Sequence, residues 1–180
     1  MPKLTQVKET KRGRYALFFD GEFAFSLDED TFAMAGLHTG DELEEWQIHD
    51  LQTKSDTRKA VDKAMDLLAL RDHAAGELYQ KLCRSFDPHS AAAAVAKMQE
   101  LNLLDDAGFA RRRAAELLRK RKSRRAILDD LHAKGIDRGA AAEAVEDLFA
   151  QSEEDEEENP ELANARALVE RHYASKLAQG

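Results

Sequence analysis

The sequence predicts a mainly α-helical protein built from tandem three-helix repeats in an elongated arrangement, preceded by a small N-terminal β-hairpin or β-sheet unit. Two stretches with matching helix caps and apolar positions, offset by roughly 50 residues, predict the repeats. An Asp-Gly pair between two strand-like segments predicts the hairpin. Charged residues make up 34% of the chain and aromatic residues only 7%, a composition that suits Ala- and Leu-rich helices better than a large β-sandwich.

Residues 1–52 are expected to form the β unit. Residues 14–19 and 22–26 have the apolar and aromatic character of strands, and residues 4–8 can add a third strand. Residues 28–35 can form a short helical turn. A hairpin alone is only marginally stable, so this unit needs a third strand or a neighbouring helix.

The Asp-Gly turn predicts the pairing of the two hairpin strands. Aspartate and glycine supply the positive φ angles of a type I′ turn. A two-residue loop pairs Phe18 with Phe23 and Ala16 with Phe25. Because cross-strand partners share a face, these four residues are expected to form one apolar side.

Residues 55–103 predict the first three-helix repeat. Ser55 or Asp56 can cap its first helix, which ends near residue 72. A second helix follows over residues 75–82. Asp87 is a good N-cap, and Pro88 suits the first position of the third helix.

Residues 104–150 predict the second repeat. Asp105, Ser123 and Asp137 can cap its three helices, and Gly135 can end the second of them. The apolar positions of the two repeats correspond: Leu78 and Leu82 to Ile127 and Leu131, and Phe86, Val95 and Met98 to Ile136, Val145 and Leu148. Chance similarity between Ala-rich helices is the alternative explanation.

An acidic linker is expected over residues 151–158, because the six consecutive acids of residues 153–158 repel one another and bury nothing. Asn159 and Pro160 then suit the start of another helix. Residues 159–180 are expected to be the first helix of an incomplete third repeat. One amphipathic helix cannot bury its apolar stripe alone.

No residue pattern predicts catalysis, so we expect no enzyme activity, metal or cofactor. The six histidines are scattered, and the common nucleotide-binding and nucleophile motifs are absent. The single cysteine, Cys83, cannot form an intramolecular disulfide and suits a half-buried helix position. No signal peptide and no membrane-spanning run occur in the sequence, which predicts a cytoplasmic protein.

A basic segment at residues 111–125 is the strongest candidate functional feature. It holds nine Lys or Arg and one acid, Glu116, which gives 9 − 1 = +8, although the whole chain carries −8. Residues 137–161 hold one Arg and eleven acids, or 1 − 11 = −10. Glu116 is expected to pair with Arg112 or Arg119. The candidate partner- or DNA-binding residues are Arg111, Arg112, Arg113, Arg119, Lys120, Arg121, Lys122, Arg124, Arg125 and Lys134.

Three explanations of this charge are open. It can contact an external acidic partner, it can be neutralised by the acidic residues 153–158, or it can simply be solvated. One glutamate cannot neutralise nine cations, which favours an external partner. Phosphate contacts would give affinity without sequence preference. Phe109 suits the core better than a base-stacking surface, which argues against dedicated single-strand binding.

The order and spacing of several motifs resemble the RecX family, regulators of the bacterial RecA recombinase. The most characteristic block is Leu104-Asp105-Asp106-x-x-Phe109-Ala110. The other matching residues are Ala64, Leu67, Leu70, Arg71, Glu77, Leu78 and Leu82 in the first repeat, and Ile127, Leu131, Lys134, Gly135 and Ile136 in the second. Together the motifs cover roughly residues 61–148, and the resemblance extends more faintly over residues 161–177.

This resemblance implies three tandem repeats and no catalysis. It also implies a protein that binds along the RecA–DNA filament and limits ATP hydrolysis and strand exchange in DNA repair and recombination. The implied partners are RecA and DNA, the latter through the filament or weakly and non-specifically, with no membrane contact and a monomeric state. Three features depart from the family: Ser123 where glycine is common, the short third repeat and the N-terminal β unit. A stand-alone helix-turn-helix module is the alternative function, and a structural adaptor is a third.

Overall fold

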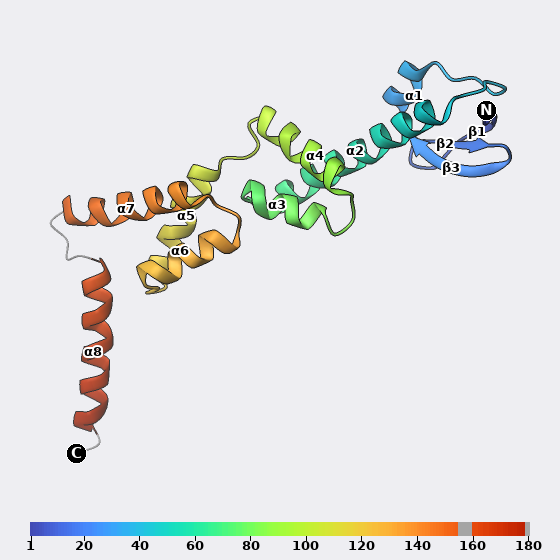
Figure 1. Ribbon diagram of the computed structural model, residues 1–180. Coiled ribbons are helices and arrows are strands. Elements are labelled where there is room, and N and C mark those ends of the chain that lie inside the picture. Colours follow the sequence, from blue (N-terminus) through green and yellow to red (C-terminus); the bar gives the residue numbers. More distant parts are fainter. Residues whose placement is uncertain (155–159, 179–180) are drawn as a thin grey trace. The chain divides into compact units, whose positions relative to one another are not determined.

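The computed structural model describes residues 1–154 and 160–178, and within them it contains three strands and eight helices (Figure 1). The chain divides into two compact units, residues 1–70 with 79–101 and residues 71–78 with 102–180. The predicted mainly α fold with a small N-terminal sheet is confirmed. The elements are β1 (Leu4–Glu9), β2 (Tyr15–Phe19), β3 (Glu22–Leu27), α1 (Glu29–Ala35), α2 (Glu45–Leu70), α3 (Ala75–Leu82), α4 (Pro88–Glu100), α5 (Asp106–Arg119), α6 (Arg124–Ala133), α7 (Arg138–Glu154) and α8 (Pro160–Ala178).

The sheet of the first unit is antiparallel, with strand order β1-β2-β3. Asp20 and Gly21 have φ angles of 49° and 87°, as the predicted hairpin turn requires. The third strand and the short helix after residue 28 are confirmed as β1 and α1. The Asp28 side chain caps α1 by accepting a hydrogen bond from the Thr31 amide.

The predicted register of the hairpin is only half right. Phe18 pairs with Phe23 as expected, but a bulge then pairs Leu17 with Phe25. The prediction that Ala16 faces Phe25 is therefore wrong. Because side chains alternate between faces, a one-residue shift changes which of them are buried. Phe25 is buried, whereas the Phe23 residue is 61% exposed, so these phenylalanines do not share one covered face.

Helix α2 begins at Glu45, ten residues before Ser55, so the prediction of a cap at Ser55 or Asp56 is wrong. Ser55 is fully buried instead. Its hydroxyl donates to the carbonyl of Ser26 on β3 and accepts a hydrogen bond from the Arg14 guanidinium. A buried hydroxyl needs such partners, and here they come from the sheet. The expected boundary between residues 52 and 55 therefore lies inside a continuous helix.

The two halves of α2 serve different cores of the first unit. Leu51 joins the strand residues Leu4, Leu17 and Leu27 in one buried cluster. Further along, α2 packs on α4, and Ala60 and Ala64 are completely buried. On α4 the buried residues are Ala91, Ala94 and Met98, and Asp87 and Pro88 start that helix as predicted.

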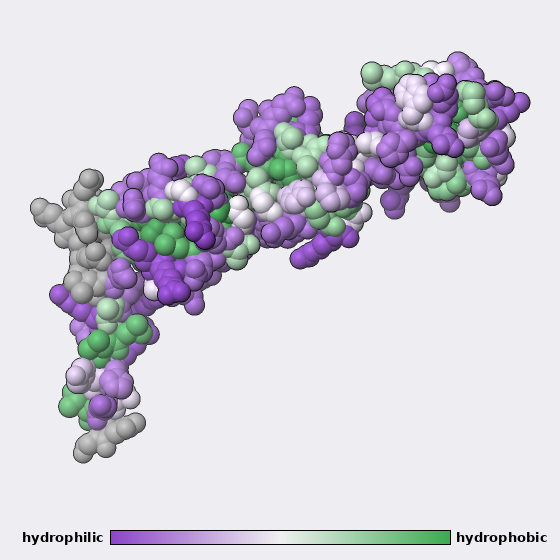
Figure 2. Space-filling view, viewed as in Figure 1, coloured by the Kyte–Doolittle hydropathy of each residue, from purple (hydrophilic) through white to green (hydrophobic). Residues whose placement is uncertain are grey.

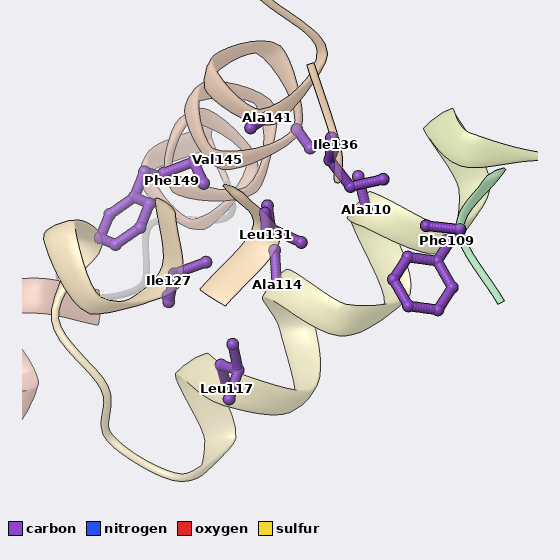
Figure 3. Close-up of a cluster of buried hydrophobic side chains, with 12 residues drawn as sticks. Phe109, Ala110, Ala114, Leu117, Ile127, Leu131, Ile136, Ala141, Val145 and Phe149 are labelled. Carbon is purple, nitrogen blue, oxygen red and sulfur yellow. The ribbon is translucent and has the colours of Figure 1, made fainter. Parts of the chain in front are cut away.

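The second unit is built on α5, α6 and α7, which pack against one another (Figure 3). Leu131 of α6 points toward Ala114 of α5, and Ile127 and Val145 are fully buried in the same cluster. Phe109 belongs to this core, as predicted. The side chains of Asp105 and Ser123 accept amide hydrogen bonds from Gly108 and Ala126, so the predicted caps of α5 and α6 are confirmed; Asp137 similarly receives the amides that open α7.

Helix α7 continues to Glu154, so the linker predicted over residues 151–158 begins within a helix. Residues 155–159 of that predicted linker, with most of its acids, lie outside the described residues. Helix α8 begins at Pro160 as expected. Its apolar stripe is solvent-exposed, with Leu168, Val169 and Tyr173 all more than half exposed, and hydrophobic residues are visible along this helix in Figure 2. The division into three-helix repeats stays a prediction.

Candidate partner-binding surface

The basic segment occupies the end of α5, the turn after it and the start of α6. Nine of the ten candidate residues lie in this stretch, and all of them except Arg113 are exposed. Six of them form the basic turn, defined as Arg119, Lys120, Arg121, Lys122, Arg124 and Arg125. The tenth candidate, Lys134, lies beyond the other end of α6. That helix has ten residues, or about 15 Å of length, so Lys134 is not part of the basic turn.

Arg121 holds a backbone conformation that usually belongs to glycine. Its φ angle is 60°. Its amide donates to the carbonyl of Leu118, and the Lys122 amide donates to Leu117, which is the Schellman ending of a helix. A side chain at this position costs roughly 1 kcal/mol relative to glycine. The requirements of the fold therefore do not explain an arginine here.

Arg124 and Arg125 are also poorly placed for helix stability. They occupy the first turn of α6, which contains no acidic residue. The amino end of a helix carries a partial positive charge, so cations there are each destabilising by about 0.3–1 kcal/mol. Unpaired amides and cations together attract anions. Arg124 and Arg125 thus place positive charge where it does not favour the helix.

Arg113 has a structural role. Its guanidinium donates to both carboxylate oxygens of Asp130, at 2.8 and 3.1 Å, and to Glu116 at 3.2 Å. These hydrogen bonds from Arg113 lower the pKa of the Asp130 carboxyl below its usual value. The side chain is only 26% exposed. Arg113 therefore joins α5 to α6 and offers little of its charge to a partner.

Glu116 does not pair as predicted. The expectation that it contacts Arg112 or Arg119 is wrong, because its two carboxylate oxygens accept from Arg113 and, at 2.8 Å, from Lys120. The hydrogen bond from Lys120 is the main reason that the pKa of Glu116 is lowered. Arg112 pairs instead with Asp72 at 3.2 Å. Asp72 and Asp130 lie outside residues 111–125. A charge count within that segment therefore misses the ion pairs that neutralise Arg112 and Arg113.

Seven of the ten candidates form no ion pair with any residue in the described part of the chain: Arg111, Arg119, Arg121, Lys122, Arg124, Arg125 and Lys134. Arg111 differs from the others because it lines a hollow together with Glu143 and Asp147. The guanidinium of Arg124 lies over the Phe149 ring, 4.7 Å from its centre, and this contact holds the Arg124 side chain in place. The exposed and unbalanced charge is therefore concentrated in the basic turn.

The sequence pattern does not single out Arg138, although the structure places it near this surface. Arg138 lines a hollow of about 420 Å³ that also includes Arg124 and Arg125. Arg138 is the one Lys or Arg in residues 137–161, which also hold eleven acids. A count of local charge therefore does not point to it. Its position follows from the packing of α7 on α6, which no local pattern predicts.

This arrangement of exposed cations can bind a polyanion. Exposed cations displace the counterions condensed around nucleic-acid phosphates, and that release gives a salt-dependent affinity. Over residues 1–154 and 160–178, no three His, Cys, Asp or Glu side chains are grouped so as to hold a metal ion. None of the described helices is both long and apolar enough to cross a bilayer.

The sequence is similar to several curated proteins called regulatory protein RecX, while no family model matches it. The relative from Lactobacillus gasseri is 31% identical over 180 residues, which are 99% of this chain and 65% of the relative. That from Caldanaerobacter subterraneus is 27% identical over 82% of this chain and 76% of its own length. The Bacillus subtilis relative is 28% identical over 81% of this chain. This chain therefore spans 65%, 76% and 56% of the length of these three relatives, in that order.

Solved structures share the fold. A crystal structure of a regulatory protein RecX superposes on the whole chain with a TM-score of 0.69 and 21% identity, and the match covers 86% of that structure. RecX from Lactobacillus salivarius matches 69% of this chain with a TM-score of 0.57 and 19% identity, over 77% of its own chain. At such identities the likeness shows a common fold and no more.

Proposed function

The chain belongs to the RecX family of regulatory proteins, and we propose that it regulates the RecA recombinase by binding the RecA–DNA filament and inhibiting its ATP hydrolysis and strand exchange. The observation that carries this proposal is the basic turn. It concentrates exposed cations, and three of them, Arg121, Arg124 and Arg125, occupy positions where they weaken the fold. Charge kept at such positions is best explained by contact with a polyanionic surface, and a nucleoprotein filament presents one.

The distribution of charge on α6 favours a regulator over a stand-alone helix-turn-helix module. A recognition helix lies deep in the major groove, between two phosphate backbones. The two arginines of α6 lie in its first turn, and Asp129 and Asp130 follow in its next turns. Helix α7 adds exposed Glu143, Glu146 and Asp147. Such acids would repel DNA if either helix entered a groove, whereas a contact limited to the basic turn avoids them.

The direct test is the rate of DNA-dependent ATP hydrolysis by RecA from the same organism. The triple variant Arg119→Glu, Lys122→Glu and Arg125→Glu reverses three charges that form no ion pair in the described structure. We expect the unsubstituted protein to lower the rate at stoichiometric ratios and this variant to lose most of that effect. The matched control is Lys11→Glu, Lys59→Glu and Lys63→Glu, which reverses three exposed charges on the first unit and should still inhibit.

Two outcomes would contradict the proposal. One is an unsubstituted protein that leaves the ATPase rate unchanged. The other is inhibition that the basic-turn and control variants lose equally, since this would indicate a general charge effect. Circular dichroism should show that both variants keep their helix content. Tight, sequence-selective DNA binding without RecA would instead favour the helix-turn-helix alternative.

A further inference from the structure

Three hollows on the second unit are lined by arginine, and they differ in how far that charge is balanced. One contains Arg112, Arg113 and Arg119, but Asp72 and Glu116 line it too. A second contains Arg111 opposite two acids of α7. The third lies between α6 and α7 and contains three arginines and a single acid, Asp129. Excess positive charge therefore remains mainly in the third, which we call the α6–α7 groove.

The α6–α7 groove is lined by arginines from the starts of both helices and by three apolar residues. Its lining residues are Arg124, Arg125, Leu128, Asp129, His132, Arg138, Ala141 and Ala142. Arg124 and Arg125 come from the first turn of α6, whereas Arg138 comes from the first position of α7. The apolar lining residues, Leu128, Ala141 and Ala142, are called the floor of the groove. The stretch of α6 from Arg124 to His132 spans about 12 Å, so the groove suits a short segment with separated anionic groups.

The arginine at one end is pre-positioned. The guanidinium of Arg124 stacks over Phe149, whose residue is only 3% exposed. A flexible arginine loses rotamer freedom on binding, and this stacking removes part of that loss beforehand. Arg124 can therefore offer its remaining N–H donors to a carboxylate in a fixed direction. The contact also joins α6 to α7.

The lining favours an acidic peptide over a nucleic-acid strand. Binding of single strands usually relies on exposed aromatic rings for base stacking, and no Phe, Tyr or Trp is among the lining residues. Asp129 would repel a phosphate backbone, although it can accept hydrogen bonds from peptide amides. Leu128, Ala141 and Ala142 can cover an apolar side chain, which a sugar–phosphate backbone lacks. Small residues also allow close approach of another backbone.

We propose that the α6–α7 groove binds an acidic peptide segment of a protein partner, with carboxylates at both ends and an apolar side chain between them. This inference rests on the proposed function and deepens it, because it divides the positive surface between two contacts. The basic turn contacts nucleic-acid phosphates, whereas the groove holds the protein component of the filament. Arg138 becomes the distinguishing residue, since it lies in the groove and outside the basic turn.

Fluorescence anisotropy with two labelled probes tests this division. The first probe is the peptide EEAALLAAEE, and the second is single-stranded oligothymidylate. Arg138→Glu reverses a groove charge, and Ala142→Glu adds a carboxylate to the exposed floor. We expect each variant to weaken peptide binding by about tenfold or more and to leave DNA binding within roughly twofold. Ala150→Glu is the matched control, because it makes the same change at an exposed site of α7 outside the groove.

The charge-reversed basic turn gives the opposite expectation for DNA. The variant Arg119→Glu and Lys122→Glu should weaken oligothymidylate binding far more than peptide binding, since neither residue lines the groove. A peptide lacking the leucines, EEAAAAAAEE, should bind the unsubstituted protein more weakly than the leucine peptide. Equal loss of both probes with Arg138→Glu would identify a nucleic-acid site and overturn the inference. Unchanged peptide binding in both groove variants would overturn it as well.

Measurements of RecA ATPase separate this inference from the proposed function. If the unsubstituted protein does not inhibit RecA, the proposed function fails, whatever the peptide measurement shows. If it inhibits and Ala142→Glu inhibits equally well, the function stands and the groove contact fails. Loss of inhibition in Ala142→Glu together with retained inhibition in Ala150→Glu supports both.

Discussion

The turns at the two ends of α6 have the same backbone motif but opposite chemistry. After α5, the Schellman ending places Arg121 at the left-handed position, and after α6 the same ending places Gly135 there, with a φ angle of 80°. Gly135 packs against Gly76, and the next residue, Ile136, is buried. Arg121 and Lys122 are exposed. The turn after α6 therefore packs against other residues, whereas the turn after α5 exposes charged side chains.

This difference indicates which residues the fold requires and which it only tolerates. Glycine at the α6–α7 turn satisfies both the backbone and its neighbours. Arginine at the α5–α6 turn suits neither the backbone, which is strained, nor its surroundings, because it makes no ion pair with any described residue. A residue that opposes the stability of its own turn is a good candidate for a role in binding. Substitutions at Gly135 and Arg121 test whether the two turns differ in this way.

The largest expected effect comes from Gly135→Ala. A Cβ atom at this position would lie 2.8 Å from the Cα of Gly76, a backbone atom that cannot move aside cheaply. The strain of a positive φ angle adds roughly 1 kcal/mol. We expect the free energy of unfolding to fall by about 2–4 kcal/mol, as measured by urea denaturation followed by circular dichroism.

Gly36→Ala is the control that isolates the strain. Gly36 ends α1 with a φ angle of 59°, and a Cβ there would meet nothing within 4 Å. Its substitution should therefore cost only the roughly 1 kcal/mol of backbone strain. An equal loss of stability in the two variants would show that the contact between Gly76 and Gly135 contributes nothing.

Helix caps and turns are the features that local sequence predicts correctly. Asp87, Asp105, Ser123 and Asp137 were each expected to start a helix, and each does. A cap depends on residues within three positions, so its chemistry is contained in a short segment. The Asp-Gly hairpin turn and the restart of a helix at Pro160 are local for the same reason.

Errors arise where distant parts of the chain decide. Ser55 has the chemistry of a cap, but β3 and Arg14 supply its hydrogen-bond partners, so α2 continues through it. The same holds at the candidate site, where Asp130 and Asp72 neutralise two of the nine cations. Arg138 reaches the groove only through helix packing. The positive charge of the site could be predicted from sequence, whereas which of its cations are free could not.

A smaller effect is expected from breaking the pair of Arg113 and Asp130. Arg113→Ala should lower the free energy of unfolding by about 1–2 kcal/mol, because the pair is largely shielded and makes two hydrogen bonds. Arg119→Ala is the control and should change stability very little, since Arg119 is exposed and has no ion pair in the described structure. Equal effects would remove the distinction between structural and binding arginines on α5.

The pH dependence of stability checks the same pair. The hydrogen bonds from Arg113 lower the pKa of Asp130 in the folded state. The pair is therefore fully stabilising above the unfolded pKa of aspartate, about 3.9, and loses its contribution as the pH falls through the lower folded value. The stability advantage of the unsubstituted protein over Asp130→Asn should be present at pH 7 and shrink below about pH 4. An advantage that grows on acidification would contradict this assignment.

Arg121→Gly should have the smallest effect on stability, and that effect should have the opposite sign. Glycine relieves the positive φ angle, which favours the folded state, although its greater freedom in the unfolded chain offsets part of the gain. We expect a net stabilisation of up to about 1 kcal/mol, measured by urea denaturation, together with weaker inhibition of RecA ATPase. Asn102→Gly is the control, because Asn102 follows α4 with a φ angle of 56° and carries no charge. It should change stability in the same direction and leave inhibition intact. If Arg121→Gly stabilises the protein and inhibition is also intact, the strain at this turn has no connection with binding, and the charge of Arg121 is incidental.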